Sequence, residues 1–214
     1  MTKVYLVRHC ESLSNEMKVA AGHTDFDISE RGKLQLKYLA ERFRDMELDV
    51  IYTSPLQRAY KTALAMGYYS KVPVVKDQRL IEKYIGELEG KPLTSLPPEM
   101  QERRRLAPHL FCPAGGETPI AAGERGFAAL LDLVEKNRGK SIAIAAHGGL
   151  LQGMFCLLRK LPWERMLEVK DLDNTCVNLV QFYDDGTWEI VYENDTSHLP
   201  ADAAAVSMFP WASK

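Results

Sequence analysis

The stretch VYLVRH, residues 4–9, is an apolar run that ends in an arginine and a histidine. Such a run predicts a buried strand, which places Arg8 and His9 at its carboxyl end. The stretch SIAIAAH, residues 141–147, follows the same pattern and delivers His147 to the end of a second strand, before two glycines. In an open α/β sheet, ligands bind outside the carboxyl ends of the strands. Both histidines are therefore predicted at the edge of the sheet where ligands bind.

Strand-like and helical patterns alternate along most of the chain. Further strands are expected at residues 50–53 and 72–75, and helices are expected after Ser29, Thr118 and His147. Ser54 and Pro55 are expected as the N-cap and first residue of another helix, with Arg58 in its first turn. Residues 175–183 and 187–193 flank a glycine-containing turn and predict a hairpin. We therefore predict an α/β fold of three layers, α/β/α, whose mostly parallel central sheet has an antiparallel edge strand.

Glycines and prolines interrupt this pattern between about residues 84 and 116. The chain has 214 residues and 46% hydrophobic residues, which fits a single buried core. We expect one domain over residues 1–214, with a small inserted cap at about 84–116. This cap carries Arg103, Arg104 and Arg105, which either bind a second phosphate or carboxylate over the site or form a solvated helix face. Three consecutive helical residues cannot all point the same way, which favours the solvated face.

The composition argues against several classes of partner. The formal net charge of −2 and a pI near 6.2 give no broad basic surface, so no nucleic-acid partner is expected. The sequence shows no signal-peptide pattern and no apolar run that would span a bilayer, so we expect a cytoplasmic protein without membrane contact. A monomer and a homodimer both stay open.

The four cysteines have no CxxC spacing and are expected as reduced thiols. A zinc site built from His9, Cys10 and Cys112 lacks the ligand pairs of structural zinc sites, so no metal is expected.

The polar residues at strand ends and helix starts suit a phosphoryl group. The guanidinium groups of Arg8 and Arg58 would hold its oxygens through charge-assisted hydrogen bonds. A neutral imidazole, that of His9, would attack the phosphorus and split hydrolysis into two steps. Glu82 would donate a proton to the leaving alkoxide, provided that burial or a neighbouring charge keeps it protonated, and would later activate water. Taken singly, each residue also fits a solvated surface, and His147 fits a simple helix start.

These motifs resemble the histidine phosphatase superfamily, also called the phosphoglycerate mutase-like family. The similar segments are LVRHCES at 6–12, GHTD at 22–25, SERG at 29–32, SPLQRA at 54–59, GELEG at 86–90, GGET at 115–118 and AHGG at 146–149. Their order and spacing cover nearly the whole chain. The resemblance implies a phosphoglycerate mutase-like fold and a phosphatase that needs neither a metal nor an organic cofactor.

The same resemblance implies a role for individual residues. His9 is then the phosphorylated nucleophile, and Glu82 is the proton donor. The phosphoryl group is clamped by Arg8, Arg58 and His147. The residues implied to bind substrate or phosphate are Asn15, Gly22, Thr24 and Gly148.

Cys10 departs from the family, which usually has glycine after the Arg-His pair. Its thiol either fits beneath the loop as a small apolar group, the interpretation we favour, or is a functional thiol made reactive by Arg8 and the anion site. A reactive thiol would make the enzyme sensitive to oxidation.

Three functions remain in competition. A phosphatase transfers the phosphoryl group to water and acts on small phosphorylated metabolites, as do the broad-specificity and α-ribazole phosphatases that this chain resembles. Cofactor-dependent phosphoglycerate mutases of the family follow the acidic residue with Arg-His-Tyr, whereas Glu82 is followed by Lys83, Tyr84 and Ile85. The mutase is therefore disfavoured. A catalytically silent member that binds phosphorylated ligands or proteins is a third class, and the complete set of catalytic residue types argues against it.

Overall fold

The structure is a computed structural model, and it describes residues 1–204. Within these residues the sheet has the strand order β3-β2-β4-β1-β5-β6. The strands are β1 (Thr2–Arg8), β2 (Val50–Thr53), β3 (Val74–Lys76), β4 (Ser141–Ala146), β5 (Val177–Phe182) and β6 (Trp188–Asp195). The first four pair in parallel, while β5 is antiparallel to both β1 and β6. The predicted hairpin at one edge of a mostly parallel sheet is thus confirmed.

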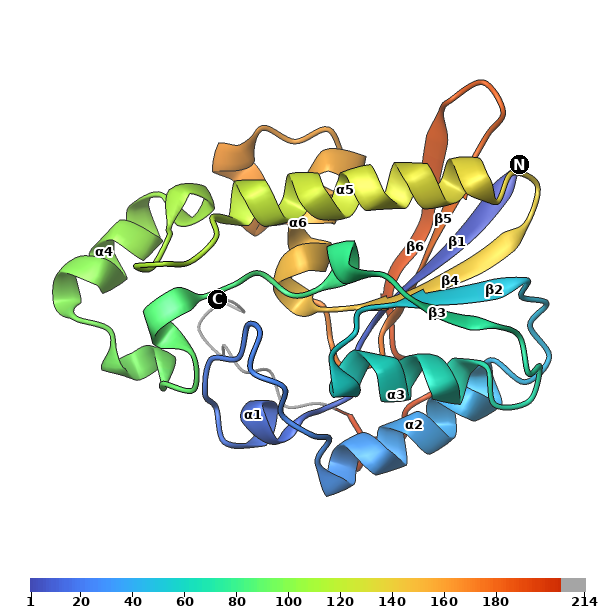
Figure 1. Cartoon of the computed structure of the whole chain (residues 1–214), viewed down its shortest axis with the longest axis horizontal. Coiled ribbons are helices and arrows are strands. Elements are labelled where there is room, and N and C mark those ends of the chain that lie inside the picture. Colours follow the sequence, from blue (N-terminus) through green and yellow to red (C-terminus); the bar gives the residue numbers. More distant parts are fainter. Residues whose placement is uncertain (205–214) are drawn as a thin grey trace.

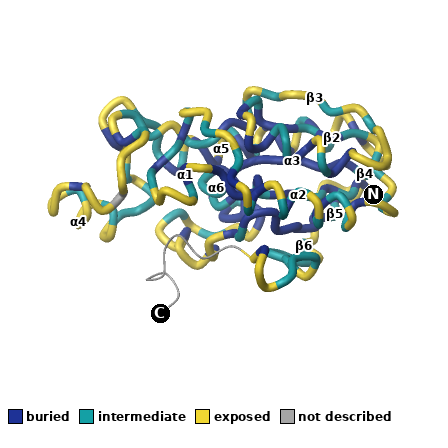
Figure 2. The backbone as a smooth tube through the Cα atoms, turned by 90° about the horizontal axis from the view of Figure 1, so that it is seen from below, coloured by how far each residue is buried: buried dark blue, intermediate teal, exposed yellow. Residues whose placement is uncertain are grey.

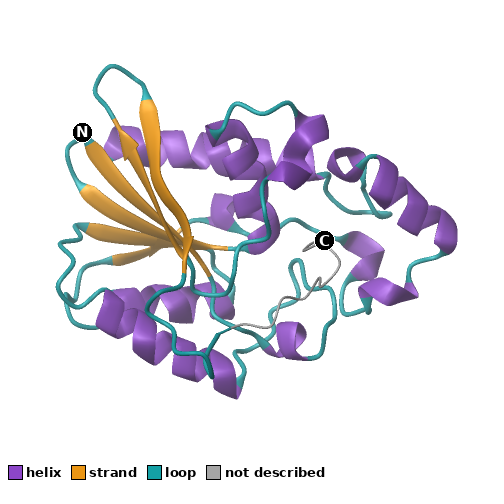
Figure 3. Cartoon of the chain, turned by 180° about the vertical axis from the view of Figure 1, so that it is seen from behind, coloured by secondary structure: helices purple, strands orange, loops and turns teal. Residues whose placement is uncertain are grey.

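Helices cover both faces of the sheet (Figures 1 and 3). Helices α2 (Glu30–Arg42) and α3 (Gln57–Met66) lie on one face, and α5 (Pro119–Lys136) and α6 (Gly148–Leu158) lie on the other. Successive strand residues point to opposite faces. Leu6 therefore belongs to the apolar cluster under α5 and α6, and Val7 belongs to the cluster under α2 and α3. The predicted three-layer fold is confirmed.

The helix starts follow local capping chemistry at two of the predicted positions. Ser29 Oγ accepts a hydrogen bond from the backbone N–H of Gly32 at 3.0 Å, and Thr118 Oγ1 accepts one from Ala121 at 3.1 Å. The prediction that Ser54 caps a helix is wrong, because α3 begins at Gln57. The Ser54 hydroxyl instead bonds the ring of His147, as described below.

The remaining elements are short. They are α1 (Leu13–Glu16), η1 (Gln78–Leu80), η2 (Gly86–Leu88), η3 (Leu93–Ser95), α4 (Pro98–Leu106), η4 (Pro108–Leu110) and η5 (Trp163–Glu168). The expected cap segment, 84–116, contains η2, η3, α4 and η4. Figure 1 shows α4 at the end of the molecule opposite the sheet, and α4 buries none of its residues (Figure 2). The single domain and its cap stay predictions.

Among the described residues, no helix has the length and apolar character needed to cross a membrane. The expected cytoplasmic location, the absence of a nucleic-acid partner and the oligomeric state stay predictions.

Candidate active site

The sheet register brings the two predicted histidines together. Arg8 at the end of β1 lies opposite Ala146 at the end of β4, and the backbone N–H of His9 donates to the carbonyl of Ala146 at 2.9 Å. The ring centroids of His9 and His147 are 5.1 Å apart. Both rings are buried, with exposed fractions of 4% and 0%. The sequence prediction of two adjacent strand-end histidines therefore matches the geometry.

His9 is oriented by its own loop. Its Nδ1 lies 2.6 Å from the carbonyl oxygen of Cys10. Because a carbonyl only accepts hydrogen bonds, Nδ1 carries the proton in the neutral ring, and Nε2 keeps its lone pair. Burial, followed by the charges of Arg58 and Arg8, lowers the pKa of His9 well below its usual value. The ring is thus held as a neutral imidazole with a nucleophilic Nε2.

His147 contacts a residue that the sequence analysis assigned to a helix cap. Its Nε2 lies 2.7 Å from Ser54 Oγ, and its buried Nδ1 has no hydrogen-bond partner among the described residues. Burial, followed by the charge of Arg58, lowers the pKa of His147 well below its usual value. A second neutral imidazole therefore adjoins the first.

Two guanidinium groups are held by backbone carbonyls. Arg58 donates to Gly22 O at 2.8 Å and to Thr24 O at 3.0 Å, and Arg8 donates to Leu172 O. Among the described residues, no carboxylate lies within ion-pair distance of either arginine. Burial lowers the pKa of Arg58, yet a guanidinium stays charged in proteins. This pair gives the site positive charge that a phosphate can neutralise.

Gly22 and Thr24 contribute to this site through their backbone. Beyond its carbonyl bond to Arg58, Thr24 donates its hydroxyl to Glu89 Oε2 at 2.5 Å. A Cβ at Gly22 would lie 2.5 Å from the carbonyl of Lys83, so only glycine fits there. Their position explains how Arg58 is held, and direct contact with substrate stays a prediction.

Gly148 begins α6 beside the guanidinium of Arg8. A Cβ added at Gly148 would lie 3.4 Å from Arg8 Nε, which is buried without a hydrogen-bond partner. Asn15 lies in α1, where its Oδ1 accepts from the backbone N–H and hydroxyl of Ser12 at 3.0 and 2.9 Å. For Gly148 and Asn15, contact with phosphate likewise stays a prediction.

Glu82 is fixed at the N-terminus of α6. Its carboxylate accepts backbone hydrogen bonds from Gly149 at 3.0 Å, from Leu150 at 2.9 Å and from Lys83 at 2.7 Å. A Cβ at Gly149 would lie 2.8 Å from Glu82 Oε1, so this glycine permits the approach. The carboxylate thus reaches the helix that begins directly after His147.

The backbone around Glu82 is held by two residues to which the sequence analysis gave no role. His23 Nε2 lies 2.9 Å from the carbonyl of Glu82, and Arg125 donates to the carbonyl of Ile81 at 2.9 Å. Arg125 is also paired with Glu117 at 2.8 Å. No local sequence signal identifies these long-range contacts.

The structure favours the interpretation of Cys10 as a small buried group over that of a functional thiol. The side chain is fully buried, and burial raises the pKa of the thiol to about 12. A thiol is nucleophilic only as the thiolate, so burial works against the reactive form. Cys112, the other proposed partner in a zinc site, is exposed, and no group of three metal-binding side chains is found among the described residues.

Only the middle arginine of the cap triplet turns inward. Arg103 and Arg105 are exposed, which fits the solvated helix face, whereas Arg104 is half-buried. Burial lowers the pKa of Arg104, while Asp171 raises it. Burial also lowers the pKa of Lys83. The nearby charge of Glu82 acts to raise this pKa, and the charge of Arg104 acts to lower it. The charge of Arg104 therefore acts on Lys83, the residue that directly follows Glu82.

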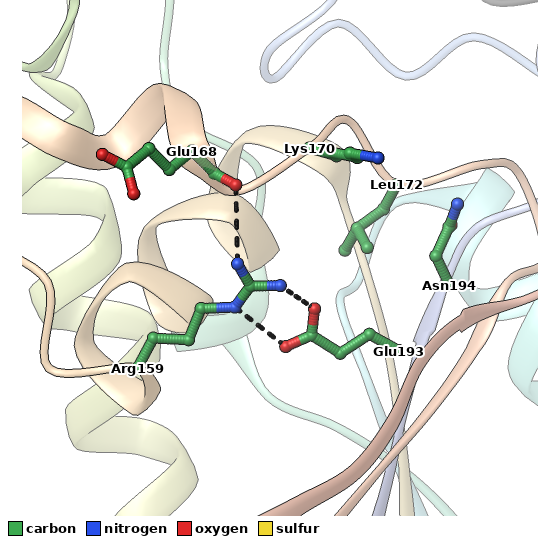
Figure 4. A pocket seen from close by; sticks show the side chains of 6 residues that line it. All are labelled: Arg159, Glu168, Lys170, Leu172, Glu193 and Asn194. Atoms are coloured by element: carbon green, nitrogen blue, oxygen red, sulfur yellow. Dashed lines mark hydrogen bonds and ion pairs between the residues drawn. The ribbon is translucent and has the colours of Figure 1, made fainter.

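A pocket of about 440 Å³ lies elsewhere (Figure 4). It is lined by Arg159, Glu168, Lys170, Leu172, Glu193 and Asn194. Arg159 is paired with the carboxylate of Glu193 and donates to the carbonyl of Glu168 at 3.4 Å. None of the predicted site residues lines this pocket, so we assign it no catalytic role.

Fold and site together define an α/β protein that gathers two neutral imidazoles and two guanidinium groups near the carboxyl ends of parallel strands, and within residues 1–204 neither guanidinium group has a carboxylate at ion-pair distance. The family model of the histidine phosphatase superfamily (branch 1) matches residues 4–196, and the chain belongs to this superfamily.

Individual relatives carry names of two kinds. The putative phosphoserine phosphatase 2 of Hydrogenobacter thermophilus is 30% identical over 200 residues, which are 92% of this chain and 98% of that protein. The probable phosphoglycerate mutase GpmB of Yersinia pestis is 31% identical over 212 residues, covering 95% of this chain and 97% of that protein. The structure of a phosphoserine phosphatase mutant (H9A) from Entamoeba histolytica in complex with phosphoserine has a TM-score of 0.83 and 26% identity. It covers 94% of this chain and 100% of that one.

Proposed function

We propose that this protein is a metal-independent phosphomonoesterase that acts through a phosphohistidine on small phosphorylated metabolites. The observation that carries the proposal is the state of His9. Its Nδ1 is committed to the Cys10 carbonyl at 2.6 Å, and its pKa is lowered by burial and by Arg58 and Arg8. The ring is thus an oriented neutral nucleophile beside two cations.

The reaction follows in two steps. His9 Nε2 forms a bond to phosphorus while the bond from phosphorus to the ester oxygen breaks, and Glu82, which this step requires in its protonated form, gives its proton to the departing alkoxide. Glu82 then accepts a proton from water, whose oxygen attacks the phosphohistidine and releases phosphate and the neutral imidazole. Arg8 and Arg58 stabilise the charge on the phosphoryl oxygens in both steps.

We further propose that the substrate carries a carboxylate near its phosphate ester. Lys83 directly follows Glu82 in the chain, and the charge of half-buried Arg104 in α4 acts on it, so the two residues would supply a second cationic group on the cap side of Glu82. The names of the similar proteins support this class, because phosphoserine and phosphoglycerate both carry a carboxylate beside a phosphate ester. Lys83 and Arg104 would bind that carboxylate while Arg8 and Arg58 bind the phosphate.

A mutase is the less favoured alternative. One similar protein is named a probable mutase. The residues after Glu82, however, are Lys83, Tyr84 and Ile85, instead of the Arg-His-Tyr of cofactor-dependent mutases in this family.

A silent phospho-ligand binder is disfavoured by the placement of Glu82, because binding alone needs no proton donor.

The test is hydrolysis of p-nitrophenyl phosphate, phosphoserine and 3-phosphoglycerate, with EDTA present, by the wild type and by His9→Ala. We expect turnover by the wild type only, together with acid-labile radiolabel on the wild-type chain after rapid quenching of a reaction with ³²P-labelled substrate. Turnover by His9→Ala would exclude the mechanism. Isomerisation of 3-phosphoglycerate without phosphate release would replace the phosphatase by the mutase.

A further inference from the structure

The segment between η5 and β5 contacts the end of β1 at three points. The backbone N–H of Thr175 donates to the carbonyl of Arg8 at 3.1 Å, and the Asn174 side-chain Nδ2 donates to the carbonyl of His9 at 2.8 Å. The carbonyl of Leu172 accepts from the Arg8 guanidinium. We call residues 172–175 the clamp, because they hold both the backbone and the side chain of the Arg8–His9 pair.

The hydrogen bond from Asn174 supplies the His9 carbonyl with a donor where the pairing of β1 with β4 has ended. The register between β1 and β4 ends at Arg8 and Ala146, so the carbonyl of His9 lies beyond the last paired residues. A buried carbonyl without a donor is unfavourable. Asn174 is itself buried, with an exposed fraction of 4%, and it is the residue that satisfies this carbonyl.

Asn174 also reaches the predicted phosphate ligand Asn15. Its Nδ2 lies 3.5 Å from Asn15 Oδ1, the atom that Ser12 also bonds. One side chain therefore contacts the backbone of the nucleophile and the amide of Asn15. A shift of Asn174 would move both.

The clamp contains a residue in an unfavourable backbone conformation, which the surrounding contacts maintain. Thr175 has a φ of 57°, in the left-handed region that β-branched residues avoid, and it is fully buried. Its hydroxyl donates to the carbonyl of Asn174 at 2.7 Å. From β6, Asn194 holds Asp173 through two bonds of 2.8 Å. Strain of this kind persists only where the surrounding contacts determine the conformation, and it is often found at functional sites.

We propose that Asn174 is a positioning residue for the phosphoryl-transfer step. It fixes the positions of His9 and Asn15 relative to the bound phosphate. This inference rests on the function proposed above. It predicts a defect in the chemical step, because substrate is bound mainly by Arg8, Arg58 and the cap cations, which keep their own contacts.

The experiment compares Asn174→Ala with Asn137→Ala. Asn137 is an equally buried asparagine with an exposed fraction of 4%, and its Nδ2 donates to the carbonyl of Leu133 at 2.8 Å and to Tyr52 at 3.0 Å, at the end of α5. Both variants lose a buried side-chain hydrogen bond, but only Asn174→Ala loses it at the candidate active site.

For Asn174→Ala we expect kcat to fall about 10- to 100-fold, as for a small misplacement of a catalytic group. KM should stay within about two-fold, since uniform binding is retained. Asn137→Ala should keep the wild-type kcat.

A second variant, Asn174→Asp, keeps the shape of the side chain and removes the N–H donor. It should reproduce the loss of kcat with an unchanged KM, after correction for the folded fraction measured by thermal unfolding. The proposal is overturned by a kcat within two-fold of the wild type in either folded variant, by an equal loss in Asn137→Ala, or by failure of both Asn174 variants to fold. Failure of the proposed function is seen separately, as wild-type protein without turnover or as an active His9→Ala.

Discussion

The strand-end site and the cap segment at 84–116 differ in how their charged groups are held. Arg58 is buried and bonded to the carbonyls of Gly22 and Thr24, which are distant in sequence. Helix α4 buries no residue, and Arg105 pairs with Glu102 within the same helix at 2.6 Å. The contrast indicates that the core holds its two arginines firmly, whereas the cap segment could change without affecting the core. Under the function proposed above, the cap would be where substrate preference is set.

The largest expected effect on the site side comes from Glu82→Gln. The amide keeps the shape of the carboxylic acid but cannot give a proton to the leaving oxygen. We expect kcat for an alkyl phosphate such as phosphoserine to fall about 10²- to 10⁴-fold. The first-turnover burst of nitrophenolate, which reports phosphorylation of His9, should slow far less, because nitrophenolate leaves without a proton. Rapid-quench measurement of the first turnover on the two substrates provides the check, because the later step, in which Glu82 acts as base, is common to both. An equal loss on both in the first turnover would remove Glu82 from the role of acid.

A smaller, substrate-dependent effect is expected on the cap side from Arg104→Ala. Loss of one charge-assisted contact should raise KM for phosphoserine about 10-fold, or about 1.4 kcal/mol. KM for p-nitrophenyl phosphate, which has no carboxylate, should not change. The matched control is Arg103→Ala, which removes an exposed neighbour from the same helix. Comparable effects of the two variants on phosphoserine would show that the cap acts only through its overall charge.

The buried histidines should make the fold sensitive to acid. The pKa values of His9 and His147 lie well below the ordinary value in the folded protein, while in the unfolded chain they lie near 6.5. Below that pH the unfolded chain binds more protons, so the free energy of unfolding falls as pH decreases. Each histidine contributes a slope of up to about 1.4 kcal/mol per pH unit.

Urea unfolding at pH 7 and pH 5.5 measures this dependence. The variant His147→Asn should show a smaller loss of stability between the two pH values than the wild type. A wild-type free energy of unfolding that rises toward pH 5.5 would contradict the assignment of neutral buried rings.

The smallest expected effect is at Cys10, where burial should protect the thiol. Peroxide treatment should leave the activity of the reduced enzyme unchanged, since the pKa of about 12 leaves almost no thiolate. Exposed Cys112 is the internal control, because mass spectrometry should detect its oxidation before that of Cys10. Oxidation of Cys10 with loss of activity would show that the loop beneath His9 opens to solvent.

The sequence predicts those parts of the site that depend on local patterns. Apolar runs that end in Arg8-His9 and in His147 place both histidines at the sheet edge, because parallel strands align their carboxyl ends. The caps at Ser29 and Thr118 are equally local. The three-layer fold follows from the alternation of the two periodicities.

Contacts between distant segments could not be predicted in this way. Ser54 has the residue type of an N-cap, yet its hydroxyl lies in hydrogen-bond distance of His147, which follows the neighbouring strand β4. Arg125 and Asn174 look like ordinary polar residues of a helix and a loop, and only folding brings them to the backbone of Ile81 and His9. The surroundings of Cys10 likewise depend on a distant segment, because its backbone N–H donates to the hydroxyl of Thr62 in α3.

The support of Arg8 and Arg58 by backbone carbonyls has a consequence for regulation of the enzyme. Released orthophosphate carries the same kind of charge as the phosphoryl group that these guanidinium groups would bind, and no carboxylate among the described residues lies within ion-pair distance of them. Product should therefore inhibit competitively. The rate in the cell would then be linked to the phosphate concentration, so that phosphate scarcity releases the enzyme from inhibition without any dedicated regulatory site.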